Sequence, residues 1–192
     1  STGVSEKIGD QQADCMLGWN NSFRYKNFAL SFQIDGRLGG DIYSYTNYAL
    51  QIAGRAECTA PGGMREDFVV DGVIRQQDGS YAPSTIKVSQ QDYWQAIGTG
   101  NTGIGEANIY DATNIRLRNI ALNYSFPSSM LKKTIFQQLK LGFSINNVWM
   151  IYSDMNGIDP EAVFITNTNA TGFENCASPT SRSYLFNVTL GF

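Results

Sequence analysis

The fold is decided by the stretch SYLFNVTLGF, residues 183–192, in which apolar residues alternate with small or polar ones. This period of two predicts a β-strand with one apolar face. The apolar face carries Tyr184, Phe186, Val188, Leu190 and Phe192. The other face carries Asn187, Thr189 and Gly191, with Leu185 as the one exception. A soluble domain has little reason to expose such a row, whereas a strand that faces lipid does.

The same alternation recurs in four earlier segments, which we predict to be strands over residues 15–25, 28–38, 114–126 and 139–150. Lys26-Asn27 reads as the tight turn of a hairpin between the first two segments. In the third segment the alternation slips by one residue near Arg118-Asn119. A slip of one residue would turn the apolar side chains to the other face, so we predict a β-bulge there that restores them.

The connections between these strands alternate in length. Residues 26–27 and 127–137 are short, whereas 39–113 and 151–182 are long. In the first long loop we expect a short helix over 45–56, a short strand over 68–74 and a helical turn over 92–97. In the short connection 127–137 we expect another helical turn over 129–133. Outer-membrane barrels have short periplasmic turns and long outside loops. The expected fold class is therefore all-β, an antiparallel transmembrane β-barrel segment with long extracellular loops.

Five strands cannot close a barrel, because the smallest membrane barrels have about eight. Open strand edges in lipid would leave backbone N–H and C=O groups unpaired, at several kcal/mol each. The remaining strands of the barrel must therefore come from preceding sequence or from another chain. Periodicity alone leaves a second possibility open, a soluble antiparallel sheet whose apolar face packs on a core.

Composition excludes several functions. Of the 192 residues only 16% are charged, against about a quarter in soluble domains. The net charge of −3 argues against a nucleic-acid partner. Histidine is absent, and Cys15, Cys58 and Cys176 lie far apart, so no His-based triad, metal spacing or disulfide framework is visible. We expect no enzyme and no catalytic, cofactor-binding or metal-binding residue. The run 98–103 (GTGNTG) matches a dinucleotide fingerprint, but no strand precedes it and no helix follows.

Several motifs resemble those of the SusC/RagA-type TonB-dependent transporters. They are WNNSFRYKNF at 19–28, GGDI at 39–42, DATNIRLRN at 111–119, LNYSFP at 122–127, NN at 146–147, GIDPE at 157–161, and Pro179 followed by Arg182-Ser183-Tyr184. They occur in the expected order along nearly the whole chain. The resemblance implies that residues 1–192 form the C-terminal portion of a barrel of about 22 strands, with the plug domain and the TonB motif outside this chain.

The resemblance further implies energy-coupled uptake of glycan or peptide nutrients across the outer membrane of a Gram-negative bacterium. The implied partners are the remainder of the same transporter, a SusD-like surface lipoprotein, the TonB complex and outer-membrane lipid. Two alternatives stay open: a passive outer-membrane barrel or adhesin, and a soluble glycan-binding β-sandwich. A plug domain in the rest of the protein would exclude the first, and a need for detergent would exclude the second.

Three groups of residues are candidates for function. Charges on the inward face would line the solute path or contact the plug, or would only be solvated or paired with neighbouring strands: Arg24, Asp35, Arg37, Arg116, Arg118 and Lys140. Aromatic residues on the first long loop would contact ligand or lipoprotein, or would only hold the loop together: Tyr43, Tyr45, Tyr48, Tyr93 and Trp94. Phe192 would be the signal for barrel assembly, or one more lipid-facing aromatic at the rim.

Overall fold

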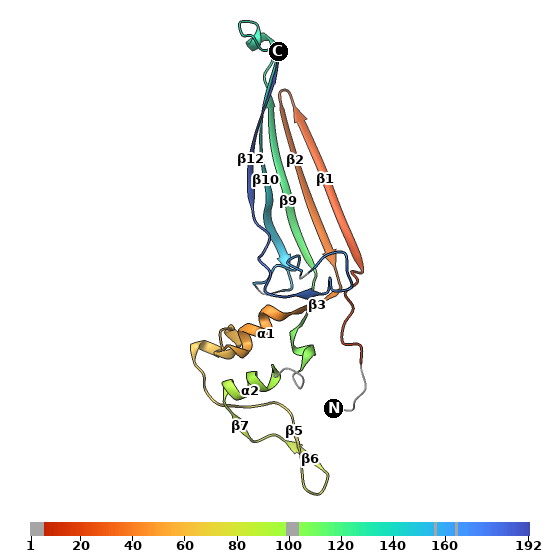
Figure 1. Ribbon diagram of the computed structural model, residues 1–192, viewed down its shortest axis with the longest axis vertical. Coiled ribbons are helices and arrows are strands. Elements are labelled where there is room, and N and C mark those ends of the chain that lie inside the picture. Colours follow the sequence, from red (N-terminus) through yellow and green to blue (C-terminus); the bar gives the residue numbers. More distant parts are fainter. Residues whose placement is uncertain (1–5, 99–103, 156, 164) are drawn as a thin grey trace.

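The main element of the protein is a five-stranded antiparallel sheet of order β1-β2-β9-β10-β12 (Figure 1). A computed structural model describes residues 6–98, 104–155, 157–163 and 165–192. The strands are β1 (Cys15–Tyr25), β2 (Phe28–Leu38), β9 (Asn114–Ser125), β10 (Gln138–Ser153) and β12 (Ser183–Gly191). They lie where the alternation of the sequence predicts them, because alternate side chains of a strand point to opposite faces.

The register of the strands confirms both the hairpin and the bulge. β1 and β2 pair continuously up to Tyr25 opposite Phe28, and Lys26 in the turn has φ 50°. Between β2 and β9 the pairing passes from Gln33 opposite Asn119 to Ile34 opposite Leu117, so Arg118 is the extra residue. The bulge returns Leu117 to the apolar face, and the sheet keeps one apolar face over its whole length.

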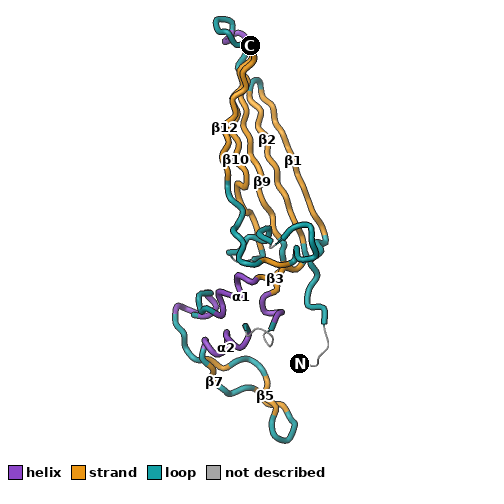
Figure 2. The backbone as a smooth tube through the Cα atoms, in the orientation of Figure 1, coloured by secondary structure: helices purple, strands orange, loops and turns teal. Residues whose placement is uncertain are grey.

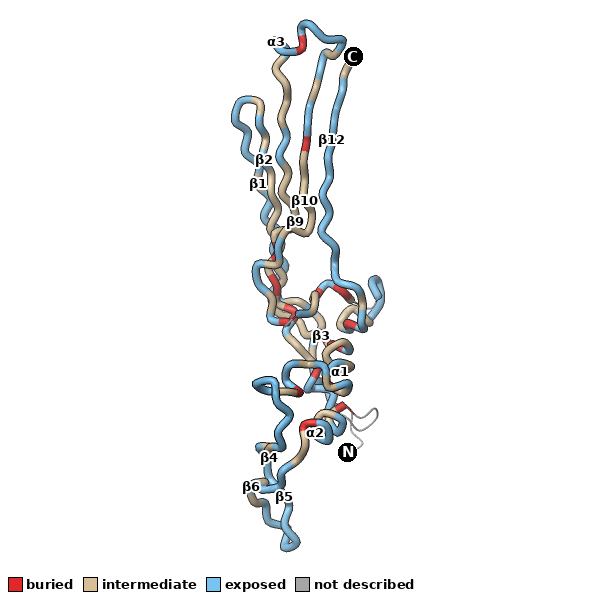
Figure 3. The backbone as a smooth tube through the Cα atoms, turned by 90° about the vertical axis from the view of Figure 1, so that its left-hand side faces the viewer, coloured by how far each residue is buried: buried red, intermediate tan, exposed pale blue. Residues whose placement is uncertain are grey.

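This apolar face is a single exposed surface. Apolar residues of neighbouring strands lie opposite one another on this face. They include Trp19, Phe23, Tyr25, Phe28, Leu30, Phe32, Ile34, Leu117, Ile120, Leu122, Tyr124, Leu141, Phe143, Ile145, Tyr184, Phe186 and Val188. Phe186 is 81% exposed and Trp19 is 56% exposed. In Figure 3 the strands form a single layer, and their residues are exposed or intermediate with few exceptions. A soluble sheet would pack this face against another layer, so the arrangement is that of a barrel wall and not of a self-contained sandwich.

Smaller elements make up the long loops. Between β2 and β9 they are β3 (Asp41–Ser44), α1 (Tyr45–Ile52), η1 (Glu57–Thr59), η2 (Pro61–Gly63), β4 (Phe68–Val69), β5 (Val73–Arg75), β6 (Tyr81–Pro83), β7 (Lys87–Val88), α2 (Gln90–Ile97), η4 (Gly105–Asn108) and β8 (Ile109–Asp111). Later in the chain are α3 (Ser128–Leu131) and β11 (Phe173–Glu174). None of the helices in the described part of the chain is long and apolar enough to cross a membrane.

Helices occur in all three segments where helical structure was expected, but the single strand expected over 68–74 is wrong. Val70 to Gly72 interrupts it, and the two pieces pair with different partners, β4 with β7 and β5 with β6. The reason is local, since Asp71-Gly72 is a turn sequence that cannot continue a strand. Residues 99–103, which complete the glycine-rich run, lie outside the described residues.

The buried core is small and lies where both long loops meet the end of the sheet. It centres on Ile42, Ala112 and Met155, packed against Tyr110, Ile158 and Val163. Figure 2 shows the loops converging on β3 at this end. Here the strands β11, β3 and β8 form a second sheet. Buried Glu174 of the second loop accepts hydrogen bonds from Ser44 and Thr46 at the start of α1, so the two loops are fixed to each other.

Candidate functional site

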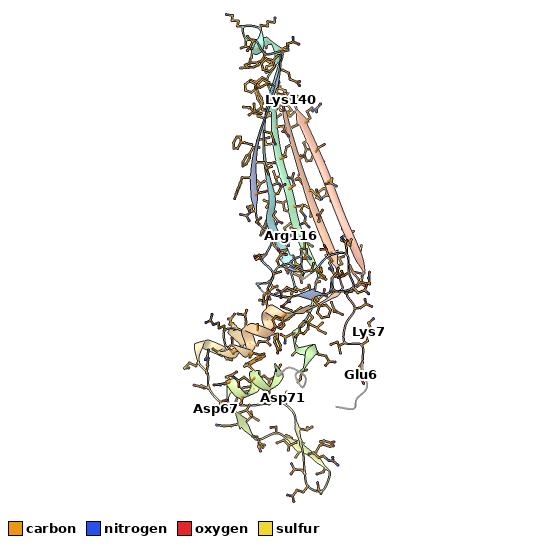
Figure 4. All side chains as sticks on the ribbon, in the orientation of Figure 1. Glu6, Lys7, Asp67, Asp71, Arg116 and Lys140 are labelled. Atoms are coloured by element: carbon orange, nitrogen blue, oxygen red, sulfur yellow. The ribbon has the colours of Figure 1, made fainter. Side chains whose placement is uncertain are left out.

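Of the six charged residues expected on the inward face, the register of the strands places five on the polar face of the sheet, for example Asp35 opposite Gly18. The sixth, Arg118, is the unpaired bulge residue, and its side chain donates to Asp35 on that face. The structure brings only three of them together, namely Asp35, Arg116 and Arg118. Arg37 donates to the backbone carbonyls of Gln11 and Gly39. Figure 4 places Arg116 near the loop end of the sheet and Lys140 near the opposite end. Arg24 and Lys140 form no salt bridge with the described residues.

Arg116 is the centre of the site. Its side chain is only 4% exposed, and Nη2 donates to Oδ1 of Asp159 at 2.6 Å. Nη1 donates to Asn147 at 2.8 Å and to Thr180 at 2.7 Å. Asp159 also accepts hydrogen bonds from the hydroxyl and the backbone N–H of Thr180, and from the backbone N–H of Glu161. A buried arginine needs such partners, because an unpaired buried charge is strongly destabilising.

Arg118, the bulge residue, joins the same group. Its two Nη atoms donate to the two carboxylate oxygens of Glu161 at 2.8 and 2.6 Å, and Nε donates to Asp35 at 2.8 Å. A bidentate pair of this kind has a fixed geometry. We call the set Asp35, Arg116, Arg118, Asp159, Glu161 and Thr180 the arginine cluster. With two arginines against three carboxylates its formal charge is −1.

The electrostatics of the cluster favour ionised Asp159. Burial opposes its ionisation, but hydrogen bonds from Thr180 and Arg116 outweigh burial and lower the pKa of Asp159 to about 2. The carboxylate is therefore charged at every physiological pH. The cluster ties residues 159–161 and Thr180 of the second long loop to β9, and a cavity of about 340 Å³ remains beside Arg116 and Asn147.

Sequence reasoning missed the loop half of this cluster. Asp159, Glu161, Thr180 and Asn147 were not among the candidates, although GIDPE at 157–161 and NN at 146–147 carry the family resemblance. The signal that could have found them is the presence of Asp159 and Glu161 in a loop otherwise rich in Asn, Thr and Gly. Arg116 and Arg118 pair mainly with carboxylates of the second long loop, partners that neither interpretation names. A role in the solute path stays a prediction for all six charges.

The five aromatic candidates do not form one site. The ring centroids of Tyr43 on β3 and Phe173 lie 6.0 Å apart. Burial raises the pKa of the Tyr43 hydroxyl. On α1 the rings of Tyr45 and Tyr48 stack at 5.1 Å, and the Tyr48 hydroxyl donates to the Gly98 carbonyl at 2.6 Å. These contacts fit a role in holding the loop together.

The other two aromatic candidates lie on α2. The rings of Tyr93 and Trp94 are 5.1 Å apart, and Phe68 lies 5.1 Å from Tyr93. Together they line a cavity, so contact with a ligand stays a prediction here. At the other end of the sheet Phe192 is 74% exposed, and its ring is 5.3 Å from Phe136. Its role as an assembly signal also stays a prediction. Within the described ranges no group of His, Cys, Asp and Glu could hold a metal ion.

Comparison with known proteins finds relatives that share one description, TonB-dependent receptor. No family model matches the chain. The TonB-dependent receptor P3 of Formosa agariphila is 27% identical over 197 residues, which cover 100% of this chain and 18% of the receptor. The TonB-dependent receptor P39 of the same organism is 29% identical over 187 residues, 96% of this chain and 17% of the receptor. The chain thus spans less than a fifth of the length of these relatives.

Solved structures give the same result. The RagAB peptide importer in its open-open state matches 92% of this chain and 17% of the matched chain, with a TM-score of 0.61 and 15% identity. In its closed-closed state it matches 98% of this chain and 18% of the matched chain, with a TM-score of 0.62 and 14% identity. At this identity the likeness shows the fold, an antiparallel barrel wall. The resemblance to a part of the barrel of SusC/RagA-type TonB-dependent transporters is therefore confirmed along the whole chain.

Proposed function

We propose that this chain is part of the barrel wall of an energy-coupled outer-membrane transporter that imports nutrients. The observation that carries this proposal is the sheet itself, with one continuous exposed apolar face and one polar, charged face. Lipid suits the first face and a hydrated lumen suits the second. The relatives named TonB-dependent receptors support energy coupling.

Residues 1–192 would form the C-terminal portion of that barrel, with β1 and β12 pairing with strands from the rest of the protein. Both are edge strands of the described sheet, and in lipid their free N–H and C=O groups need partners. The long loops would then lie on the extracellular side and the short turns on the periplasmic side, as is usual for such barrels.

The substrates would be glycan or peptide fragments, captured with a SusD-like surface lipoprotein in a Gram-negative bacterium. The structural likeness to an importer described as acting on peptides supports the peptide class. Exposed aromatic rings on the outer loops would suit either class, since such rings stack on sugars and on peptide side chains alike.

Uptake by cells tests the proposal. Fluorescent oligopeptides or oligosaccharides would be given to a strain that lacks the full gene and to the same strain complemented with that gene. Each strain would be tested with and without a protonophore. We expect uptake only in the complemented strain, and its loss with the protonophore. Uptake that ignores the protonophore would indicate a passive barrel. Recovery of the full-length protein from cells without detergent would refute a membrane wall altogether.

A further inference from the structure

A second cavity lies in the first long loop, between η2, β4 and α2. It has a volume of about 500 Å³, and its walls include Met64, Phe68, Tyr93, Trp94, Glu66 and Asp67. We call it the Trp94 pocket. Figure 4 labels Asp67 beside this part of the loop, well away from Arg116 on the sheet. The pocket therefore shares no residue with the arginine cluster.

The aromatic walls of the Trp94 pocket are held in place by their own contacts. The rings of Phe68 and Tyr93 meet edge to face at 77°, and those of Tyr93 and Trp94 at 83°, each pair 5.1 Å apart. The indole N–H of Trp94 donates to the side-chain oxygen of Gln90 at 3.1 Å, and Gln90 is 8% exposed. These contacts fix the rings before any ligand arrives, which lowers the entropy cost of binding.

The walls of the pocket include two acidic residues. The side chains of Glu66 and Asp67 are exposed and form no hydrogen bond or ion pair with any described residue. The adjacent cation, Arg65, instead donates to the backbone carbonyl of Gly54 at 2.6 Å. Two free carboxylates next to an aromatic wall favour a cationic ligand, because both groups attract positive charge.

We propose that the Trp94 pocket binds an arginine side chain of a nutrient peptide. A guanidinium group is planar, stacks on aromatic rings and pairs with carboxylates through its fork of N–H groups. Its methylene stem would pack on the Met64 thioether and the Phe68 ring. The pocket suits a neutral sugar less well, because the side-chain amide of Gln90 is already hydrogen-bonded to Trp94 and to the Glu66 carbonyl and is not free to bind sugar hydroxyls. The proposal rests on the proposed importer role for the source of the peptide.

Binding of matched tripeptides to the purified full-length transporter tests this assignment by calorimetry. The probes are Gly-Arg-Gly and Gly-citrulline-Gly, which differ in charge and little in shape. We expect the arginine peptide to bind about tenfold more tightly, a difference of about 1.4 kcal/mol. The preference should shrink in high salt, because exposed charges are screened. Equal affinity for the two peptides would overturn the proposal.

Variants locate the preference within the loop. The double variant Glu66→Gln, Asp67→Asn should abolish it, and Trp94→Leu should weaken binding of both peptides. Asp71→Asn is the control for charge, since it removes a negative charge of the same loop at a residue that is not part of the pocket walls. An equal loss in Asp71→Asn would assign the effect to the overall charge of the loop and would refute the pocket.

The binding test is independent of transport. If the arginine preference is present but uptake does not need energy, the pocket stands and the proposed import mechanism falls. If uptake needs energy but the arginine preference is absent, the pocket proposal alone is wrong.

Discussion

Replacing Asp159 with asparagine is expected to release the second long loop from the sheet. The wild-type carboxylate accepts four hydrogen bonds, one from Arg116, two from Thr180 and one from the backbone of Glu161. Removing one partner of a buried ion pair costs roughly 3–5 kcal/mol. Arg116 would keep Asn147 and Thr180, and Glu161 lies 3.6 Å away, so we expect the lower end of that range.

A loss of about 3 kcal/mol corresponds to roughly a hundredfold change in the equilibrium between docked and released loop. Hydrogen–deuterium exchange of the full-length protein in detergent would measure it in peptides from residues 165–182. We expect exchange there to accelerate about a hundredfold, while β9 stays protected. Asp154→Asn is the control, because Asp154 is exposed in the same loop and, among the described residues, its carboxylate accepts a hydrogen bond only from the hydroxyl of Tyr152. Equal exchange in the two variants would refute the reasoning.

The pH dependence of docking follows from the same carboxylate. The pKa of Asp159 falls from 3.8 to about 2 on folding, which is worth about 2 kcal/mol. A carboxyl group whose pKa is lower in the folded state contributes its full stabilisation at pH values above its unfolded pKa. This contribution is lost as the pH falls through the folded pKa. Cleavage of the loop by pepsin should therefore accelerate between pH 4 and pH 2 in the wild type. In Asp159→Asn it should be fast throughout, and identical pH profiles would contradict this account.

Three further predictions concern the sheet and the first loop. Phe186→Arg should lower the stability of the membrane-inserted barrel by roughly 2–4 kcal/mol in urea titrations, and Phe186→Leu should not. Gly142→Ala should cost less than about 1 kcal/mol in the same assay, because its Cβ would meet the side-chain oxygen of exposed Asn123, which can rotate away, and Gly18→Ala, whose Cβ meets open space, should behave alike. Tyr48→Phe should cost about 1 kcal/mol by losing a 2.6 Å hydrogen bond, seen as faster proteolysis of the loop than in Tyr45→Phe.

Much of the sheet could be predicted because its information is local. Alternation at period two marks each strand, and a break in that alternation marks the bulge at Arg118. The tight turn at Lys26 could be predicted because only two residues separate the two alternating segments. Short loop elements were harder to place, and the expected strand over 68–74 was wrong because a turn at Asp71-Gly72 outweighs the apolar residues around it.

The candidate site could be predicted only in part. The strand residues of the arginine cluster were found, because charges stand out on an alternating strand. Their loop partners were missed, since Asp159 and Glu161 are each 43 residues from the arginine they pair with. No periodicity connects a loop carboxylate to a strand that distant. Their pairing depends on how the loop docks, which is a property of the folded chain.

The polarity of the inward face explains why the loop is anchored by ion pairs. The opposite face of every strand is apolar, so the alternation leaves polar side chains on the face that the loop contacts. The second loop is itself rich in Asn, Thr, Gly and Ser and offers few apolar residues to bury. Its apolar residues, among them Met155 and Ile158, pack in the core at the end of the sheet and cannot hold the loop on the polar face of the wall. Paired charges can, provided that each buried group finds its partner, as Arg116 finds Asp159 at 2.6 Å. The same requirement makes the docked position specific, because a shifted loop would leave Arg116 buried without its carboxylate.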